Sequence, residues 1–532
     1  MRRFLVLGMM AVLALAGCGG GDEVQEISAP NLPSAKDSTF VYLHHLGIVA
    51  DWDPASSYSG EVVAMENIYD SLTTYNPRTR RAAPRLAERW QTSPDGKVWT
   101  FTLRSGVIFH TGRPVDADAV KASIERTKRM GAGAAYIWDP VQRITVKDPL
   151  TVEFRLEYAA PLDLIASADY AAYIYDTRAA GSGDLKKWFQ AGRDAGSGPY
   201  TVASWKKGRE KELMLRAFDR YWGGWDGPHY RNIEFRVTPD PGRAYRLLLS
   251  GEASYVQRLS PELFRRVSAT PGVRTLQVPS FQNLLMLFNT ASGPLADIRL
   301  RKAVQKAVDY DGLITQLQGA VAPAPGLVPE GLLGHTPGLT QKQDLAGASA
   351  LLTEAGYGPG GKPLRLTLTY AQGDDDEELL VRTLKRALAE LNIQLDAKAM
   401  RWEEQRDQGK SADQAKSQDI FVMYWYPDYA DAYSLFLNFF HSAGPVSSNL
   451  AYLKSGDVDA KIDRLPSLAT NSRSSAERAY ADLQRGLIQE KAVVAVPWVL
   501  TYRRAYLGNV QGLTDNPAYP GVVFVHELTP GG

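Results

Sequence analysis

The chain has 532 residues, of which 44% are hydrophobic and 22% are charged. This length is too great for one compact domain, so we expect two or three folding units that each bury a core. Sixty basic and 59 acidic residues leave a formal net charge of +1, which provides no field to hold a polyanion, so nucleic acid is not an expected partner.

The first residues have the features of an export signal. Arg2 and Arg3 precede an apolar run from Phe4 to Ala16, and this run leads into Gly17-Cys18. The run is too short for a bilayer-spanning helix, which needs about 20 residues, but it suits the apolar region of a signal peptide. It looks like a bacterial lipoprotein signal, which predicts lipidation of Cys18 and a lipid anchor in the membrane of the cell envelope, on the periplasmic side. An ordinary secretory signal with a chance cysteine is the alternative.

Cys18 is the only cysteine of the chain, so its acylation would leave no thiol for a disulfide. Packing alone must then hold the mature fold. The following residues, through about Lys36, are rich in Gly, Pro, Ser and acidic side chains. This composition predicts a flexible tether.

The first half of the chain has the pattern of strands. Apolar residues alternate over Trp99–Leu103, Val152–Leu156 and Ile233–Val237, as in half-buried strands. Between them, Asp116 to Met130 has an acidic first turn and basic residues near its end, which predicts a helix.

From about Asn289 the pattern becomes mixed, and Asp297 is placed to cap a helix. Apolar spacing then predicts a strand over 364–370, a helix over 380–391 and a strand over 393–397, which form a βαβ unit with parallel pairing. Ile420–Trp425 is continuously apolar and aromatic, as in a central strand covered on both faces. Ligands in open α/β sheets bind just beyond the carboxyl ends of such strands.

Common catalytic and metal-binding motifs are absent from the sequence. Gly356 to Lys362 approaches a P-loop, but Pro363 replaces the hydroxyl residue and the order of helix, loop and strand is wrong. If they lie on a strand, His44 and His45 would point to opposite faces, which disfavours a metal clamp. The acidic run 374–378 lacks the spacing of a calcium loop and predicts a helix start. No metal and no cofactor is therefore expected.

A series of segments resembles the peptide-binding family of bacterial extracellular solute-binding proteins, family 5, whose members serve importers of oligopeptides, dipeptides or nickel. The segments occur in family order over nearly the whole mature chain: Pro84-Arg85-Leu86-Ala87-Glu88-Arg89-Trp90, Asp95 to Arg104, Gly106 to His110, Gly112 to Val115, Gly196-Ser197-Gly198-Pro199-Tyr200, Tyr221-Trp222-Gly223-Gly224, Asp297 to Val304, and Leu351 to Tyr357.

This resemblance implies an α/β protein with the two-lobed periplasmic-binding-protein (Venus flytrap) fold and an extra sub-lobe inserted in lobe 1. The expected units are the signal peptide (1–17), the tether (18–36), the first part of lobe 1 (37–70), the sub-lobe (71–188), the continuation of lobe 1 (189–284), lobe 2 (285–498) and the C-terminal return to lobe 1 (499–532).

The resemblance also implies the ligand-binding residues. In the family, a carboxylate just after a tryptophan-containing strand pairs with the α-amino group of a peptide, and Asp428 in Trp425-Tyr426-Pro427-Asp428-Tyr429 matches it; a cap of the following turn is the alternative. A buried ammonium needs such a partner. The other candidates are the aromatic walls Trp425, Tyr426 and Tyr429, the weaker acid Asp431, the loop residues His45, Leu46 and Gly47, and Phe281 with Gln282 near the hinge.

The expected function is capture of short peptides and their delivery to ABC transporter permease subunits, by a protein that is a monomer and not an enzyme. One alternative keeps the fold but binds a nickel chelate, a sugar or another small solute. A remote alternative is a secreted hydrolase that uses Asp51, Asp53 or Glu61.

Overall fold

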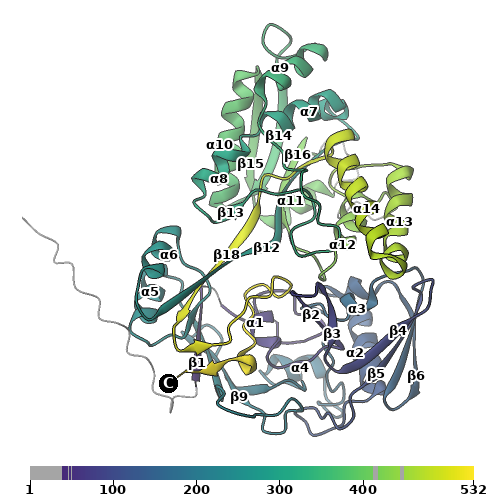
Figure 1. The fold of residues 1–532 in the computed structure, drawn as a ribbon, viewed down its shortest axis with the longest axis vertical. Helices are drawn as coiled ribbons and strands as arrows, with labels where there is room; N and C mark the ends of the chain where they lie inside the picture. The colour runs from purple at the N-terminus through teal and green to yellow at the C-terminus, as the bar shows by residue number, and fades with distance from the viewer. Residues whose placement is uncertain (1–38, 46, 50, 411–416, 444–448, 532) are drawn as a thin grey trace, which may run out of the picture.

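A computed structural model describes residues 39–45, 47–49, 51–410, 417–443 and 449–531. One 12-stranded sheet runs through both lobes, in the order β15-β14-β16-β12-β18-β11-β1-β10-β9-β8. Outside this order, β13 pairs with β18, and β17 pairs with β12. Figure 1 shows lobe 2 above and lobe 1 with its sub-lobe below. The lobes are therefore parts of one hydrogen-bonded sheet.

Two long neighbouring strands, β12 (Val273–Phe288) and β18 (Val499–Leu507), connect the lobes. They pair antiparallel from Val273 opposite Leu507 to Pro279 opposite Thr501, and pairing resumes at Asn283 opposite Val499 after a register shift. Such irregularities bend and twist a strand. Both chain crossings between the lobes therefore lie side by side at a bend.

In lobe 2, the predicted βαβ unit is confirmed. β14 (Leu364–Ala371) and β15 (Ile393–Met400) pair in parallel, and α10 (Asp375–Glu390) connects them. The carboxylate of Asp374 accepts hydrogen bonds from the N–H groups of Asp376 and Glu377, so the acidic run begins a helix as predicted. β16 (Ile420–Trp425) lies between β14 and β12, and its first three residues are fully buried, as expected for a central strand.

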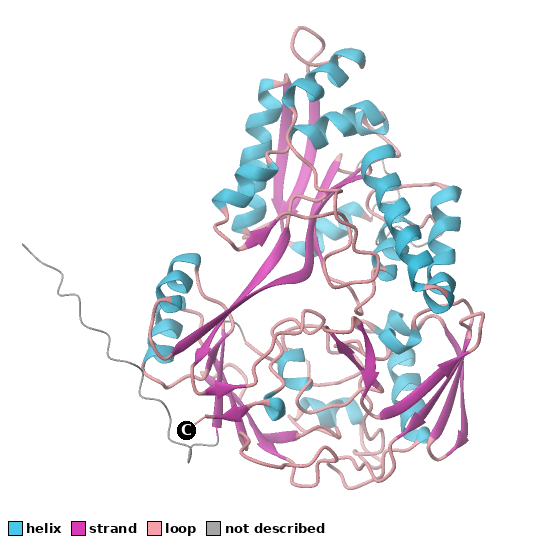
Figure 2. Cartoon of the chain, in the orientation of Figure 1, coloured by secondary structure: helices cyan, strands magenta, loops and turns pink. Residues whose placement is uncertain are grey.

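Helices cover the faces of the lobe 2 sheet, as Figure 2 shows. The predicted cap is confirmed, because the Asp297 carboxylate accepts from the N–H of Arg299 at the start of α7. The helices and short strands of this lobe are α7 (Ile298–Ala307), α8 (Tyr310–Gln316), β13 (Val321–Ala322), α9 (Leu345–Glu354), α11 (Trp402–Gly409), α12 (Tyr433–Phe440), α13 (Gly456–Asn471), α14 (Arg473–Arg485) and β17 (Val494–Ala495).

Lobe 1 holds the other end of the sheet. β1 pairs in parallel with β10 and β11, whereas β10 pairs antiparallel with β9. Its elements are β1 (Thr39–His44), α1 (Val62–Met65), β2 (Thr73–Asn76), β3 (Arg81–Pro84), α4 (Leu185–Gln190), β8 (Tyr200–Trp205), β9 (Lys211–Ala217), β10 (Asn232–Val237), α5 (Pro241–Leu249), β11 (Tyr255–Val256), α6 (Pro261–Ser268), β19 (Val510–Gln511) and β20 (Thr529–Pro530).

The sub-lobe has its own four-stranded sheet, in the order β4-β5-β7-β6. It comprises β4 (Ala87–Thr92), β5 (Val98–Leu103), α2 (Ala117–Met130), the 3-10 helix η1 (Ala135–Trp138), β6 (Val141–Asp148), β7 (Thr151–Leu156) and α3 (Leu162–Ile165). Its core forms a separate cluster around Phe101, Trp138 and Phe154. The domain boundaries given above stay predictions.

Of the two adjacent histidines, only His44 lies on a strand. β1 ends at His44, so His45 lies outside the strand and the alternation of faces does not apply. The two rings lie near each other, with their centroids 5.1 Å apart. Among the described residues, no group of three or more His, Cys, Asp or Glu side chains is arranged to hold a metal ion, and no helix in that part of the chain is long and apolar enough to cross a membrane.

A buried ion pair joins the sub-lobe to lobe 1. Arg126 of α2 donates from Nη1 to Oδ1 of Asp53 at 2.6 Å and from Nη2 to Oδ2 at 2.5 Å. Asp53 is 0% exposed, and its loop belongs to lobe 1. A paired and hydrogen-bonded geometry of this kind is required to keep a charge inside a protein.

The substitution Asp53→Asn should lower the free energy of unfolding by about 3 kcal/mol, because it leaves the largely buried Arg126 guanidinium without its counter-charge. Urea denaturation followed by circular dichroism measures this loss. As a control, Glu262→Gln breaks the exposed ion pair with Arg266 and should change stability by less than about 0.5 kcal/mol. Equal effects of the two substitutions would contradict the prediction.

Candidate functional site

The loop after β16 brings Asp428 to the interface between lobe 2 and the sub-lobe. Its Oδ1 accepts a hydrogen bond from Oη of Tyr136 at 2.5 Å, and its Oδ2 accepts one from Nδ2 of Asn438 at 2.9 Å. Tyr136 belongs to η1 of the sub-lobe, whereas Asn438 belongs to α12 of lobe 2. The carboxylate is thus bound from both sides of the interface.

Burial raises the pKa of Asp428 to about 6, although the hydrogen bonds from Tyr136 and Asn438 oppose this rise. The structure shows no basic side chain bonded to it within the described residues. Tyr136 is 41% exposed, and its hydroxyl is a neutral donor to this carboxylate. The site is an acid with neutral partners that can accept a cation.

Two of the three predicted aromatic residues lie between the lobes. Tyr426 donates from Oη to the carbonyl of Pro517 in the C-terminal segment at 3.1 Å. Tyr429 is buried within the hydrophobic cluster of the sub-lobe, although it comes from lobe 2. Trp425, by contrast, lies in the main core, where its ring meets that of Phe439 edge to face at 6.5 Å.

Asp431 is engaged within lobe 2. Its Oδ1 accepts from the N–H of Tyr433 at 2.6 Å and from Oη of Tyr480 at 3.0 Å. Burial raises its pKa to about 6. Because both partners belong to lobe 2, the carboxylate holds the start of α12 in this structure.

The residues predicted near the hinge lie at the register shift of β12. Phe281 is fully buried and meets the ring of Tyr75 edge to face, with centroids 6.1 Å apart. The N–H of Gln282 donates to Oγ of Ser280 at 3.0 Å. Tyr75 also donates from Oη to the carbonyl of Gly331 at 2.9 Å, which links lobe 1 to lobe 2 beside the strand crossing.

The loop after β1 is described in part. His45 is half-buried, and burial followed by the charge of Arg258 lowers its pKa. Gly47 is exposed, and the next N–H, that of Ile48, donates to Glu212 at 3.0 Å. Leu46 lies outside the described residues. Neither His45 nor Gly47 is bonded to Asp428, so the structure does not gather the whole predicted set around one point.

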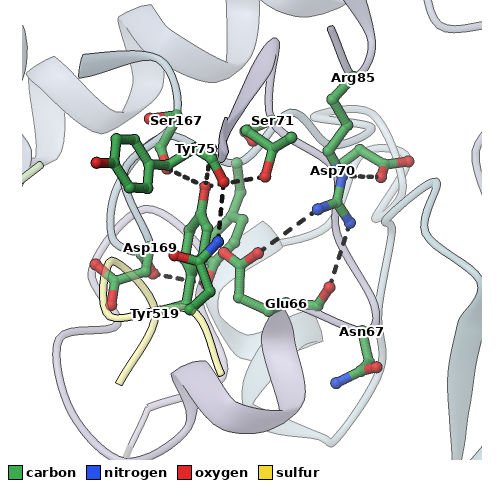
Figure 3. A network of polar contacts seen from close by, with 12 residues as sticks. Glu66, Asn67, Asp70, Ser71, Tyr75, Arg85, Ser167, Asp169 and Tyr519 are labelled. Atoms are coloured by element: carbon green, nitrogen blue, oxygen red, sulfur yellow. Dashed lines mark hydrogen bonds and ion pairs between the residues drawn. The ribbon is translucent and has the colours of Figure 1, made fainter. Parts of the chain in front are cut away.

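A network of buried charges lies in lobe 1 beside the interface (Figure 3). Nε of Arg85 donates to Oδ1 of Asp70 at 2.6 Å, and its Nη1 lies 3.8 Å from Oε2 of Glu66. Oδ2 of Asp70 accepts from Ser197 and Trp222 at 2.9 and 3.0 Å. Burial raises the pKa of Glu66 to about 7, and Arg85 opposes this rise.

Sequence reasoning missed Tyr58, Tyr136, Asp169 and Tyr170, which also lie at this interface. The hydroxyls of Tyr58 and Tyr136 are 3.4 Å apart, and the rings of Tyr58 and Tyr170 have centroids 5.1 Å apart. No motif marks these positions. These residues are distant from Asp428 in the sequence, and only their proximity to it in the fold shows their relevance.

The carboxylates considered for a hydrolase are all engaged in local structure. Asp53 binds Arg126, Oδ2 of Asp51 accepts from Ser56 at 2.6 Å, and Oε1 of Glu61 accepts from two backbone N–H groups, those of residues 58 and 59. These contacts organise the loop before α1. They provide no pair of acids facing a common space.

Comparisons with known proteins identify the family and the fold. The family described as "Bacterial extracellular solute-binding proteins, family 5 Middle" matches residues 81–446. The chain is 27% identical over 450 residues to the probable D,D-dipeptide-binding periplasmic protein DdpA of Escherichia coli (strain K12), covering 84% of both chains.

Solved structures share the fold. HbpA2 from Haemophilus parasuis superimposes with a TM-score of 0.80 at 19% identity, covering 92% of this chain and 99% of the other. NikA from Brucella suis, in complex with Fe(III)-EDTA, gives 0.77 at 22% identity and covers 92% and 99%. The two-lobed periplasmic-binding fold predicted from the sequence is therefore confirmed, while identities this low say nothing of the ligand.

The raised pKa of Asp428 should make stability depend on pH. The folded state holds this proton up to about pH 6, whereas the unfolded chain releases it near its ordinary pKa of 3.8, so stability falls as pH rises between these values. The difference corresponds to about 3 kcal/mol. In Asp428→Asn, the fall in melting temperature from pH 4 to pH 7 should be smaller than in the wild type. Identical pH profiles would contradict the assignment.

Proposed function

Because the chain belongs to the bacterial extracellular solute-binding proteins of family 5, we propose that it captures short peptides with a free amino terminus. It would deliver these peptides to the permease of an ABC importer. Members of this family are binding proteins of transport systems and not enzymes. The bound amine would lie against Asp428, between lobe 2 and the sub-lobe.

The observation that carries this proposal is the bonding of Asp428 across the interface. Its partner Tyr136 is a neutral donor from the opposite lobe, so an ammonium group can take the same place and add a charge-assisted hydrogen bond. The ammonium would also keep Asp428 ionised, which favours binding over the empty state. Recognition of the backbone terminus leaves side chains free to vary, so selectivity should be broad.

Tyr426 and Tyr429 support this role by their positions. Both come from the same loop as Asp428, and both contact the opposite side of the interface. Their rings offer flat apolar contacts and polar ends for an extended peptide. Separation and closure of the lobes about β12 and β18 would let the ligand enter and would report its presence to the permease.

A non-peptide ligand is the second candidate, since NikA from Brucella suis holds Fe(III)-EDTA within the same fold. The acids at this interface disfavour an anionic chelate here, because like charges in a desolvated site repel. A neutral sugar is compatible with the tyrosine walls, but it would gain no ionic contact with Asp428. The response of Asp428 variants therefore separates these ligand classes.

Asp428→Asn should weaken the binding of Ala-Ala by about 100-fold or more, since removal of one partner from a buried ion pair costs about 3–5 kcal/mol. Isothermal titration calorimetry measures this loss. Asp419→Asn is a matched control, because Asp419 is also buried but lies at the opposite end of β16, where it binds Thr367. N-acetyl-Ala-Ala should bind as weakly to the wild type as Ala-Ala binds to Asp428→Asn. Equal affinity for the acetylated and free peptides would overturn the proposal.

The proposed location is the periplasmic side of the cell envelope, where Cys18 would hold the chain to a membrane through its lipid and the protein would act as a monomer. Residue 18 lies outside the described part of the structure. Cys18→Ser should move the protein from the membrane fraction to the soluble fraction of lysed cells, because one lost anchor removes most of its membrane affinity. Retention of the variant in the membrane fraction would contradict the lipid anchor.

A further inference from the structure

A second buried acid, Asp169, lies in the sub-lobe close to the interface with lobe 2. It follows α3, and its backbone carbonyl accepts a hydrogen bond from Oη of Tyr173 at 2.7 Å. Its side chain is 2% exposed, and Oδ2 has no hydrogen-bond partner within the described residues. A buried carboxyl oxygen without a partner is costly, so its presence calls for an explanation.

The neighbouring arginine does not provide that partner. Arg85 is bound to Asp70 at 2.6 Å and faces Glu66 at 3.8 Å. Figure 3 shows the carboxyl group of Asp169 on the far side of this network, directed away from Arg85. One arginine thus serves two acids, and Asp169 remains as an additional acid without an ion-pair partner in the described structure.

Asp169 directly precedes Tyr170, whose ring centroid lies 5.1 Å from that of Tyr58, and the Tyr58 hydroxyl lies 3.4 Å from that of Tyr136, the partner of Asp428. Burial, and then the charge of Asp169, raises the pKa of Tyr426, which comes from the loop of Asp428. Burial, and then the charges of Asp428 and Asp169, raise the pKa of Tyr58. Tyr58 in turn lies beside Tyr136 and Tyr170, so the two acids border one tyrosine-lined region.

We infer that Asp169 is a second cation-binding residue at this interface and that it holds the ammonium or guanidinium group of a basic side chain near the amino terminus of the peptide. This inference rests on the proposed function. Two acids from opposite lobes would then bind the two cations of one ligand, and Asp169 would gain its missing partner. The rings of Tyr58 and Tyr170 would add cation–π contacts along the side chain.

The test compares lysine with norleucine, which has the same unbranched four-carbon side chain without the ammonium group. Lys-Ala, Ala-Lys, norleucyl-alanine and alanyl-norleucine are titrated calorimetrically into the wild-type protein. We expect the lysine peptide to bind at least tenfold more tightly than its norleucine counterpart at one of the two positions. In Asp169→Asn, this preference should fall to less than twofold, while the norleucine peptides keep their affinity within about twofold.

Asp419→Asn controls for the loss of a buried acid elsewhere and should retain the full preference for lysine. Asp169→Glu keeps the charge and should retain part of the preference for lysine peptides. This variant provides the comparison with the wild type if Asp169→Asn folds poorly. Equal binding of lysine and norleucine peptides at both positions by the wild type, or an unchanged preference in Asp169→Asn, would overturn the inference. Failure of all four peptides to bind would instead refute the proposed peptide function.

Discussion

One acid, Asp428, is bonded from both lobes at once and organises the interface between them. Asp428 receives one hydrogen bond from Asn438 of its own lobe and one from Tyr136 of the sub-lobe. Neither donor is charged, so burial of the carboxylate is only partly offset, and its pKa rises to about 6. A ligand ammonium that replaces the Tyr136 hydroxyl would form an ion pair with Asp428. The free energy that this ion pair contributes to binding would depend on the lobes being closed.

The continuous sheet allows the contact between Asp428 and a ligand to depend on the closure of the lobes. β12 and β18 pass through both lobes and pair with each other on either side of the register shift at 279–283. A bend confined to this pair can change the angle between the lobes while the core of each one stays packed. Such a bend would form or break the contacts of Tyr75 with Gly331 and of Tyr426 with Pro517 together with the one at Asp428.

Local sequence was sufficient for much of the fold, because periodicity and caps are local properties. β14, α10 and β15 form the predicted parallel unit, and β16 is the predicted buried strand that places Asp428 at its carboxyl end. β1 ends at His44, so His45 lies in the loop where the family resemblance placed it. Tyr136 and Asp169 could not be predicted, since their importance comes only from the packing of the sub-lobe against lobe 2.

The most direct measurement is a crystal structure of the protein with a bound lysine-containing dipeptide. We expect the α-amino nitrogen to lie within hydrogen-bond distance of Asp428, the Tyr136 hydroxyl to have moved from that carboxylate or to share it, and both lobes to enclose the ligand. A peptide bound elsewhere, or one whose amino group faces solvent while Asp428 keeps its bond to Tyr136 unchanged, would contradict the account.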